Sequence, residues 1–136
     1  LQQIGRWWGR SDRRTPERRF GDRGEQYAAR FLKRQGIRVL TRNYLTSRGE
    51  IDLVCRDRDV LVFVEVKTRQ RGEPLQAVNH RKRQRLVRAG KEFLRMHGLP
   101  NHQPFRFDVI GIIWPEKGAT QPELQYYRAA FHAGDL

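Results

Sequence analysis

Residues 60–68, with the sequence VLVFVEVKT, constrain the fold more than any other stretch of the chain. A half-buried strand alternates apolar and polar residues, whereas this run is apolar on both faces until Glu65. Such a run is typical of a strand in the middle of a sheet, where both faces are covered. The other elements are therefore expected to be arranged around it.

A helix is expected before this strand, over residues 22–36. Asp22 is a good N-cap, and Glu25 follows three residues later, which is the spacing of a capping box. Apolar residues then recur at helical spacing, and Gly36 is a natural stop. On this interpretation Glu25 belongs to the first turn of the helix.

A second helix is predicted over about 80–97, capped by Asn79 and ended by Gly98. Four further stretches have the composition of strands: 37–44, 50–56, 105–114 and 123–128. The resulting order is α-β-β-β-α-β-β. It indicates a mixed α/β sandwich, with helices packed on a sheet.

Residues 1–20 are expected to form a basic N-terminal arm, and residues 21–136 a single domain. The arm is rich in Arg, contains Trp7 and Trp8, and is broken by Pro16. One interpretation is a flexible basic segment. The other is an arm that docks its tryptophan pair on another surface, such as the second subunit of a homodimer.

The net charge of +13 favours a polyanionic partner, nucleic acid first and an anionic membrane surface second. The single cysteine, Cys55, excludes a disulfide framework and a cysteine-based zinc site. No apolar run approaches the roughly 18 residues of a membrane helix, and residues 1–20 lack the apolar core of a signal peptide. We therefore expect a cytoplasmic protein with no membrane attachment.

Strand pairing predicts an acidic site in the middle of the chain. A turn of two residues (Arg58-Asp59) or of four (57–60) would place Asp52 opposite Glu65, and Glu50 opposite Lys67. Two facing carboxylates repel, so a divalent cation, a shared proton or the neighbouring lysine must compensate. Mg²⁺ suits such oxygen ligands. The plainer alternatives are a Glu50–Lys67 ion pair and a solvated face for the two acids.

The start of the second predicted helix is strongly basic. It carries five cations, Arg81, Lys82, Arg83, Arg85 and Arg88. Arg81, Lys82, Arg85 and Arg88 are candidates for contact with nucleic-acid phosphates, and those at 81, 85 and 88 share one helix face; a solvated face is the alternative. No base-reading motif is present, so selectivity for shape is expected. Elsewhere, Asp108 is expected to be a buried partner of an arginine, and Cys55 to belong to the core.

Several short motifs make the chain resemble a known superfamily. Asp52 followed by Glu65-Val66-Lys67 resembles the PD-(D/E)xK phosphodiesterases, which include restriction endonucleases and archaeal Holliday-junction resolvases. More closely, the chain resembles the YraN-like family of small bacterial endonuclease-like proteins. Ile51 stands where the superfamily signature has Pro. The matching stretches are Gly24-Glu25, Asn43-Tyr44, 48–53, 62–69, Ala77-Val78, Arg81-Lys82 and 106–109.

The resemblance implies a restriction-endonuclease-like core and a role for each acidic-site residue. Asp52 and Glu65 would be ligands of Mg²⁺ (or Mn²⁺), together with the carbonyl of Val66. Lys67 would orient the attacking water or stabilise charge on the phosphorane, and Glu25 would be the acid that resolvase-like relatives place on the first helix. For Glu25 the alternative is the capping box, and for Glu50 the alternatives are an extra ligand and the partner of Lys67.

Three functions compete on this basis. The first is a Mg²⁺-dependent nuclease that hydrolyses DNA, in particular structured or branched DNA. The second is a nucleic-acid-binding protein with a nuclease-like fold that does not cut. The third is a scaffold whose charge only confers solubility, which the basic helix disfavours. DNA rather than RNA is the expected partner.

Overall fold

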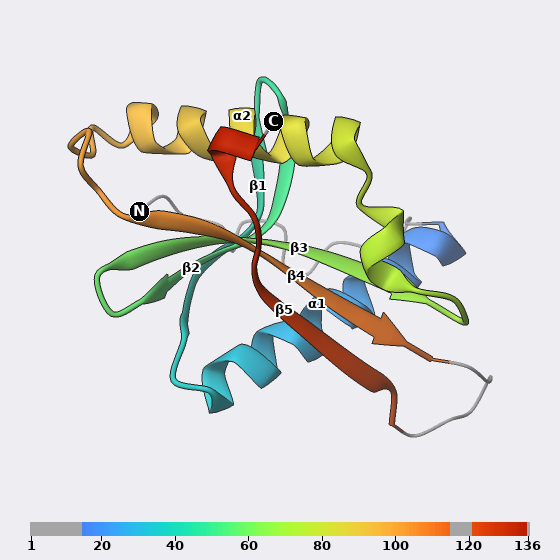
Figure 1. Cartoon of the computed structure of the whole chain (residues 1–136). Coiled ribbons are helices and arrows are strands. Elements are labelled where there is room, and N and C mark those ends of the chain that lie inside the picture. The colour runs from blue at the N-terminus through green and yellow to red at the C-terminus, as the bar shows by residue number, and fades with distance from the viewer. Residues whose placement is uncertain (1–14, 115–120, 136) are drawn as a thin grey trace.

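The central strand predicted from the sequence is at the centre of the sheet. A computed structural model describes residues 15–114 and 121–135, and in it five strands pair in the order β1-β2-β3-β4-β5 (Figure 1). Their bounds are Arg38–Thr46, Gly49–Asp57, Val60–Arg69, Phe105–Ile113 and Glu123–Phe131. Only β3 and β4 pair in parallel; the other neighbours are antiparallel. Helix α2 (His80–Met96) connects the two parallel strands, as a parallel pair requires.

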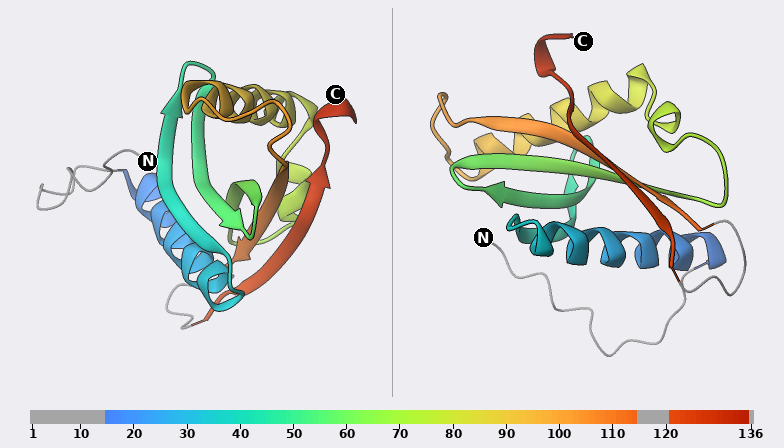
Figure 2. Two further views of the ribbon diagram at one scale, coloured as in Figure 1. Left: turned by 90° about the vertical axis from the view of Figure 1, so that its left-hand side faces the viewer. Right: turned by 60° about the horizontal axis from the view of Figure 1, so that its bottom comes forward.

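Helix α1 (Pro16–Arg34) lies on one face of the sheet and α2 on the other (Figures 1 and 2). Each helix covers its own apolar cluster: Ala28 and Leu32 of α1 pack with Val64, and Leu86 of α2 packs with Phe63. Neighbouring residues of β3 thus enter opposite cores, which explains why this strand is apolar on both faces. The element order and the flanking helices confirm the predicted α/β class, and the arrangement is consistent with a restriction-endonuclease-like core.

The start of the first helix was predicted wrongly. Helix α1 begins at Pro16, and its N-cap is Thr15, whose Oγ1 accepts a hydrogen bond of 3.1 Å from the backbone N–H of Arg18. Proline at the first helical position has no amide hydrogen to satisfy and a φ already suited to the helix. Asp22 therefore lies inside α1, where it pairs with Arg18 at 3.4 Å. Residues 16–20 are helical, and the rest of the predicted arm, residues 1–14, lies outside the described residues.

The second helix follows the sequence closely. The side chain of Asn79 accepts a 3.0 Å hydrogen bond from the backbone N–H of Lys82, as its predicted role as N-cap requires. Gly98 has a φ of 62°, in the left-handed region that ends helices. A short 3-10 turn, η2 (Pro74–Ala77), precedes α2, and a second, η3 (Ala133–Asp135), follows β5.

Candidate functional site

The hairpin of β2 and β3 has the predicted register over most of its length. Its pairs run from Asp57–Val60 to Leu53–Val64 around the two-residue turn at Arg58-Asp59. The pairing ends there, and the side chain of Asp52 replaces the next backbone contact: its Oδ2 accepts a 2.8 Å hydrogen bond from the N–H of Val66. Asp52 is therefore fixed where β2 separates from β3.

Three carboxylates meet at this point. Glu25 of α1 and Glu50 and Asp52 of β2 each offer a carboxylate oxygen, and these oxygens all lie within 4.8 Å of one another. We call these three residues the carboxylate cluster. Glu25 is buried and lies in the middle of α1 against the sheet, not in the predicted first helical turn, because α1 starts earlier than predicted. Its alternative interpretation as a capping-box residue is wrong.

Asn43 of β1 joins two members of the carboxylate cluster. Its Nδ2 donates to Oε1 of Glu25 at 2.7 Å and to Oε1 of Glu50 at 3.1 Å. The β1–β2 pairs Arg42–Leu53 and Tyr44–Ile51 place Asn43 opposite Asp52. Asn43 has a φ of 51°, a left-handed conformation that asparagine tolerates better than most residues. One amide, at a left-handed residue of the edge strand, thus connects α1 to β2.

Glu50 does not face Lys67, contrary to the prediction. Its carboxylate contacts Asn43 and lies 3.3 Å from the guanidinium of Arg18 on α1. The regular register cannot be extended this far, because the β2–β3 pairing stops at Leu53–Val64. Lys67 pairs instead with Glu65, with 3.0 Å between Nζ and Oε2.

Only one of the two carboxylate oxygens of Glu65 has a partner among the described residues. Glu65 is 4% exposed, and its Oε1 is buried with no hydrogen-bond partner among the described residues. A buried carboxylate oxygen without a partner carries a desolvation cost that a cation or a bound water would remove.

Burial and mutual repulsion both raise the pKa values of Asp52 and Glu25. Burial raises the pKa of Asp52 well above its usual range, and the negative charges of Glu65 and Glu25 raise it further. Burial also raises the pKa of Glu25, which the hydrogen bond from Asn43 partly offsets. Close acids with raised pKa values are typical of sites that bind a cation or exchange a proton.

A glycine allows α1 to approach the sheet at the site. A Cβ on Gly24 would lie 1.9 Å from Oγ1 of Thr68 on β3, so only glycine permits this contact without a shift. Glu25 is the next residue of the helix, and its place in the carboxylate cluster depends on this approach. The pair Gly24-Glu25 thus acts as a unit.

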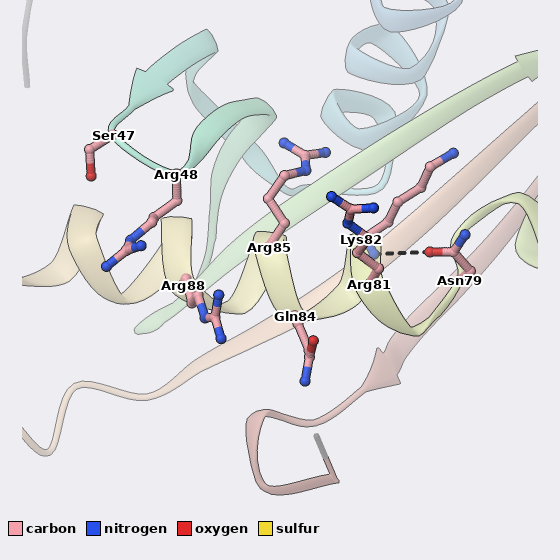
Figure 3. Close-up of a pocket in the computed structure, with 8 residues that line it drawn as sticks. All are labelled: Ser47, Arg48, Asn79, Arg81, Lys82, Gln84, Arg85 and Arg88. Atoms are coloured by element: carbon pink, nitrogen blue, oxygen red, sulfur yellow. Dashed lines mark hydrogen bonds between the residues drawn. The ribbon is translucent and has the colours of Figure 1, made fainter.

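The basic side chains of α2 line a groove of about 700 Å³ beside the site (Figure 3). We call it the cationic groove; its lining residues are Ser47, Arg48, Asn79, Arg81, Lys82, Gln84, Arg85 and Arg88. The structure thus brings together four of the five predicted cations, including the three that share a helix face. Arg83 lies elsewhere: its Nε donates to the carbonyl of Val78, and its guanidinium stacks over Phe131.

Two other sequence-predicted residues are structural. Asp108 is fully buried and accepts hydrogen bonds from Arg106 at 3.1 Å and Tyr126 at 2.5 Å, which confirms the expected arginine partner. Cys55 is fully buried in the core under α1, as predicted, and burial raises the pKa of its thiol to about 12.

Sequence reasoning missed the contributions of β1 and of the turn that follows it. Asn43 was one of the residues that carried the family resemblance, but no role followed from it. Ser47 belonged to no motif, and Arg48 belonged to the matching stretch 48–53 without a role of its own; the packing of the β1–β2 turn beside α2 identifies both as groove residues.

Comparison with known proteins gives the family. Residues 24–112 match the family described as "Uncharacterised protein family UPF0102", a span that includes the carboxylate cluster, Glu65, Lys67 and the cationic groove. The chain belongs to the UPF0102 family. This confirms the resemblance to the YraN-like proteins.

Relatives within the UPF0102 family cover most of the chain. A UPF0102 protein of Chloroflexus aurantiacus is 45% identical over 98 residues, which are 72% of this chain and 82% of the relative. A second, of Anaeromyxobacter dehalogenans, is 42% identical over 82% of this chain and 83% of its own length. A third, of Pseudomonas syringae pv. syringae, is 40% identical over 87% and 97%. Within the described part of this UPF0102 chain, no helix is long and apolar enough to cross a membrane.

Proposed function

We propose that the protein is a Mg²⁺-dependent nuclease that hydrolyses phosphodiester bonds of DNA, with structured or branched DNA as the expected substrate. The observation that carries the proposal is the position of the carboxylate cluster. Its Asp52 accepts a hydrogen bond from Val66, the residue between Glu65 and Lys67, and Arg85 of the cationic groove lies 3.4 Å from the carbonyl of its Glu50. Acids for a hard cation, an ammonium group and a surface for phosphates thus occur side by side.

The residues present fit a divalent cation. Asp52, Glu65 and the carbonyl of Val66 would hold it, with Glu25 and Glu50 as additional acids. The buried Oε1 of Glu65 lacks a hydrogen-bond partner among the described residues, and burial together with neighbouring negative charge raises the pKa values of Asp52 and Glu25, so a cation would favour the ionised acids. When bound, such an ion lowers the pKa of a water and neutralises charge on a phosphoryl oxygen.

The chain's own groups supply the remaining requirements. Lys67, paired with Glu65 at 3.0 Å, brings an ammonium group to the acids, where it can orient a water or stabilise negative charge on the phosphoryl group. The cationic groove binds the phosphate backbone and holds the scissile bond in place. Backbone binding carries no base information, so the proposal includes no sequence specificity.

The test is cleavage of linear, flapped, four-way-junction and RNA substrates with Mg²⁺, with Mn²⁺ and with chelator. Cutting is expected with either metal and not with chelator. Asp52→Asn and Glu65→Gln should abolish it, whereas Glu123→Gln, at an exposed carboxylate on β5, should cut at the wild-type rate. Cutting that persists in Asp52→Asn would place the activity elsewhere.

A nucleic-acid-binding protein that does not cut is the second candidate. The cationic groove supports it, because none of the described residues that line the groove is acidic and phosphate binding there needs no metal. Tight binding in chelator together with no cutting of any substrate in Mg²⁺ or Mn²⁺ would establish this function instead.

A further inference from the structure

The turn between β1 and β2 is a closed unit that stands beside helix α2 (Figure 1). The Oγ1 of Thr46 donates to the carbonyl of Gly49 at 2.7 Å and accepts from the N–H of Arg48 at 3.0 Å. Ser47 and Arg48 form the tip and are exposed. The internal bonds give the tip a defined shape and leave its two side chains available for other contacts.

A carboxylate on α2 holds this tip. The backbone N–H of Ser47 donates to Oε2 of Glu92 at 2.8 Å, and the hydroxyl of Ser47 donates to Oε1 of the same carboxylate. These two bonds lower the pKa of Glu92, so the carboxylate is ionised at neutral pH. The turn is therefore attached to α2 by two hydrogen bonds to one carboxylate.

This attachment makes Arg48 part of the cationic groove. Figure 3 shows Arg48 reaching from the turn toward α2, from which Arg81, Arg85 and Arg88 project. The groove thus has cations on two walls, one from the helix and one from the turn. A surface of this kind fits a polyanionic strand better than a single small anion.

The cationic groove continues to the carboxylate cluster and to the Glu65–Lys67 pair. Nη1 of Arg85 lies 3.4 Å from the carbonyl of Glu50, and it would lie 2.5 Å from a Cβ on Gly49, so the guanidinium rests directly on the start of β2. At the other side, the charge of Lys67 lowers the pKa of Lys82. Arg85 is therefore a neighbour of the carboxylate cluster, and Lys82 is a neighbour of Lys67.

We infer that the β1–β2 turn is the second wall of a groove for the phosphate backbone of a nucleic acid strand. Arg48 contacts a phosphate, and Glu92 is the positioning residue that holds the turn against α2 through Ser47. The strand runs from Arg48 along α2 toward the carboxylate cluster. That direction rests on the proposed nuclease function, whereas the binding contact does not.

The contact is tested by binding of a fluorescein-labelled DNA duplex in chelator over a range of salt concentrations. Arg48→Gln should weaken binding about three- to tenfold and reduce the slope of log affinity against log salt by about 0.9. The matched control is Arg34→Gln, which removes an exposed arginine at the end of α1 on the opposite face of the sheet and should leave the slope unchanged. Equal slopes for the two variants would overturn the inference.

The role of Glu92 is tested by combining variants. Removal of a negative charge near the groove should by itself tighten binding, so a purely electrostatic Glu92 predicts that Glu92→Ala strengthens binding by the same factor in wild type and in Arg48→Gln. The positioning role predicts weaker binding in wild type and no weakening when Arg48 is already absent. If Glu92→Ala changed the binding affinity by the same factor in wild type and in Arg48→Gln, the positioning role of Glu92 would be overturned. Absence of cutting in Mg²⁺ would refute the nuclease proposal and leave these binding results standing.

Discussion

Asn43 shows how a single side chain can organise an acidic site. Glu25 and Glu50 come from different elements, and their charges repel. The amide of Asn43 donates to both and offsets part of this cost, but only because the backbone takes a φ of 51° that directs the side chain to them. Pairwise strand arithmetic could not predict this left-handed residue, nor that Glu50 contacts Asn43 and Arg18 instead of Lys67.

Asn43→Gly removes the side-chain amide but keeps the backbone conformation, because glycine accepts a positive φ without strain. Under the proposed function, Asn43 orients two acids that assist metal binding, so its loss is expected to lower Mn²⁺ affinity by about tenfold or more, measured by titration calorimetry. Asn43→Ala should lose the same affinity and, in addition, about 1 kcal/mol of unfolding free energy for its strained backbone. Asn101→Gly, in an exposed turn, is the matched control. Wild-type Mn²⁺ affinity in Asn43→Gly would contradict the positioning role.

The raised pKa of Asp52 predicts an unusual pH dependence. Because the folded-state pKa lies above the unfolded value, the folded protein binds more protons, and the contribution of Asp52 to stability falls as pH rises through the folded pKa. Asp52→Asn removes the repulsion while its amide oxygen can still accept from Val66. In metal-free buffer the variant should therefore melt higher than wild type at pH 7, and the gain should vanish in acid. A lower melting temperature at pH 7 would show that the carboxylate is structurally required.

At the scale of elements, the start of α1 was the main error and had a consequence for the site. Asp22 and Glu25 match a capping box, but Thr15 followed by Pro16 is also a good helix start, since proline suits the first helical position. With Pro16 assigned to the basic arm, the predicted helix begins only at residue 22 and Glu25 belongs to its first turn. The extended helix buries Glu25 against the sheet, where it joins Asp52.

The approach of α1 to β3 can be tested at Gly24. In a helix interior, Gly→Ala should stabilise by about 1 kcal/mol through propensity alone. Here the new Cβ would overlap Oγ1 of Thr68, and overpacking of this kind costs about 1–3 kcal/mol. We expect a net loss of stability for Gly24→Ala in urea unfolding, together with weaker Mn²⁺ binding as Glu25 moves away. The double variant with Thr68→Ala should recover part of both losses; a stabilised Gly24→Ala would contradict the close approach.

At the scale of the whole molecule, the order of elements and the central position of β3 were predictable because they depend on local patterns: apolar runs, caps and turns. The register of the β2–β3 hairpin followed from its short turn. The features that could not be predicted depend on contacts between segments that are distant in the sequence. The cationic groove needs the β1–β2 turn to pack beside α2, and neither segment alone indicates this.

Because the carboxylate cluster shares no residue with the cationic groove, the metal and the nucleic acid of the proposed function should be separable on the intact protein. A ligand at about 100 times its Kd stabilises the folded state by about 2.7 kcal/mol, which raises the Tm by several degrees. We expect Mn²⁺ to raise the Tm of wild type but not of Asp52→Asn, and DNA in chelator to raise both. The triple variant of Arg48, Arg81 and Arg88 to Gln should keep the Mn²⁺ response and lose most of the DNA response. It leaves Arg85 in place because that guanidinium also contacts the carbonyl of Glu50. If each variant lost both responses, the metal and the nucleic acid would share one inseparable site.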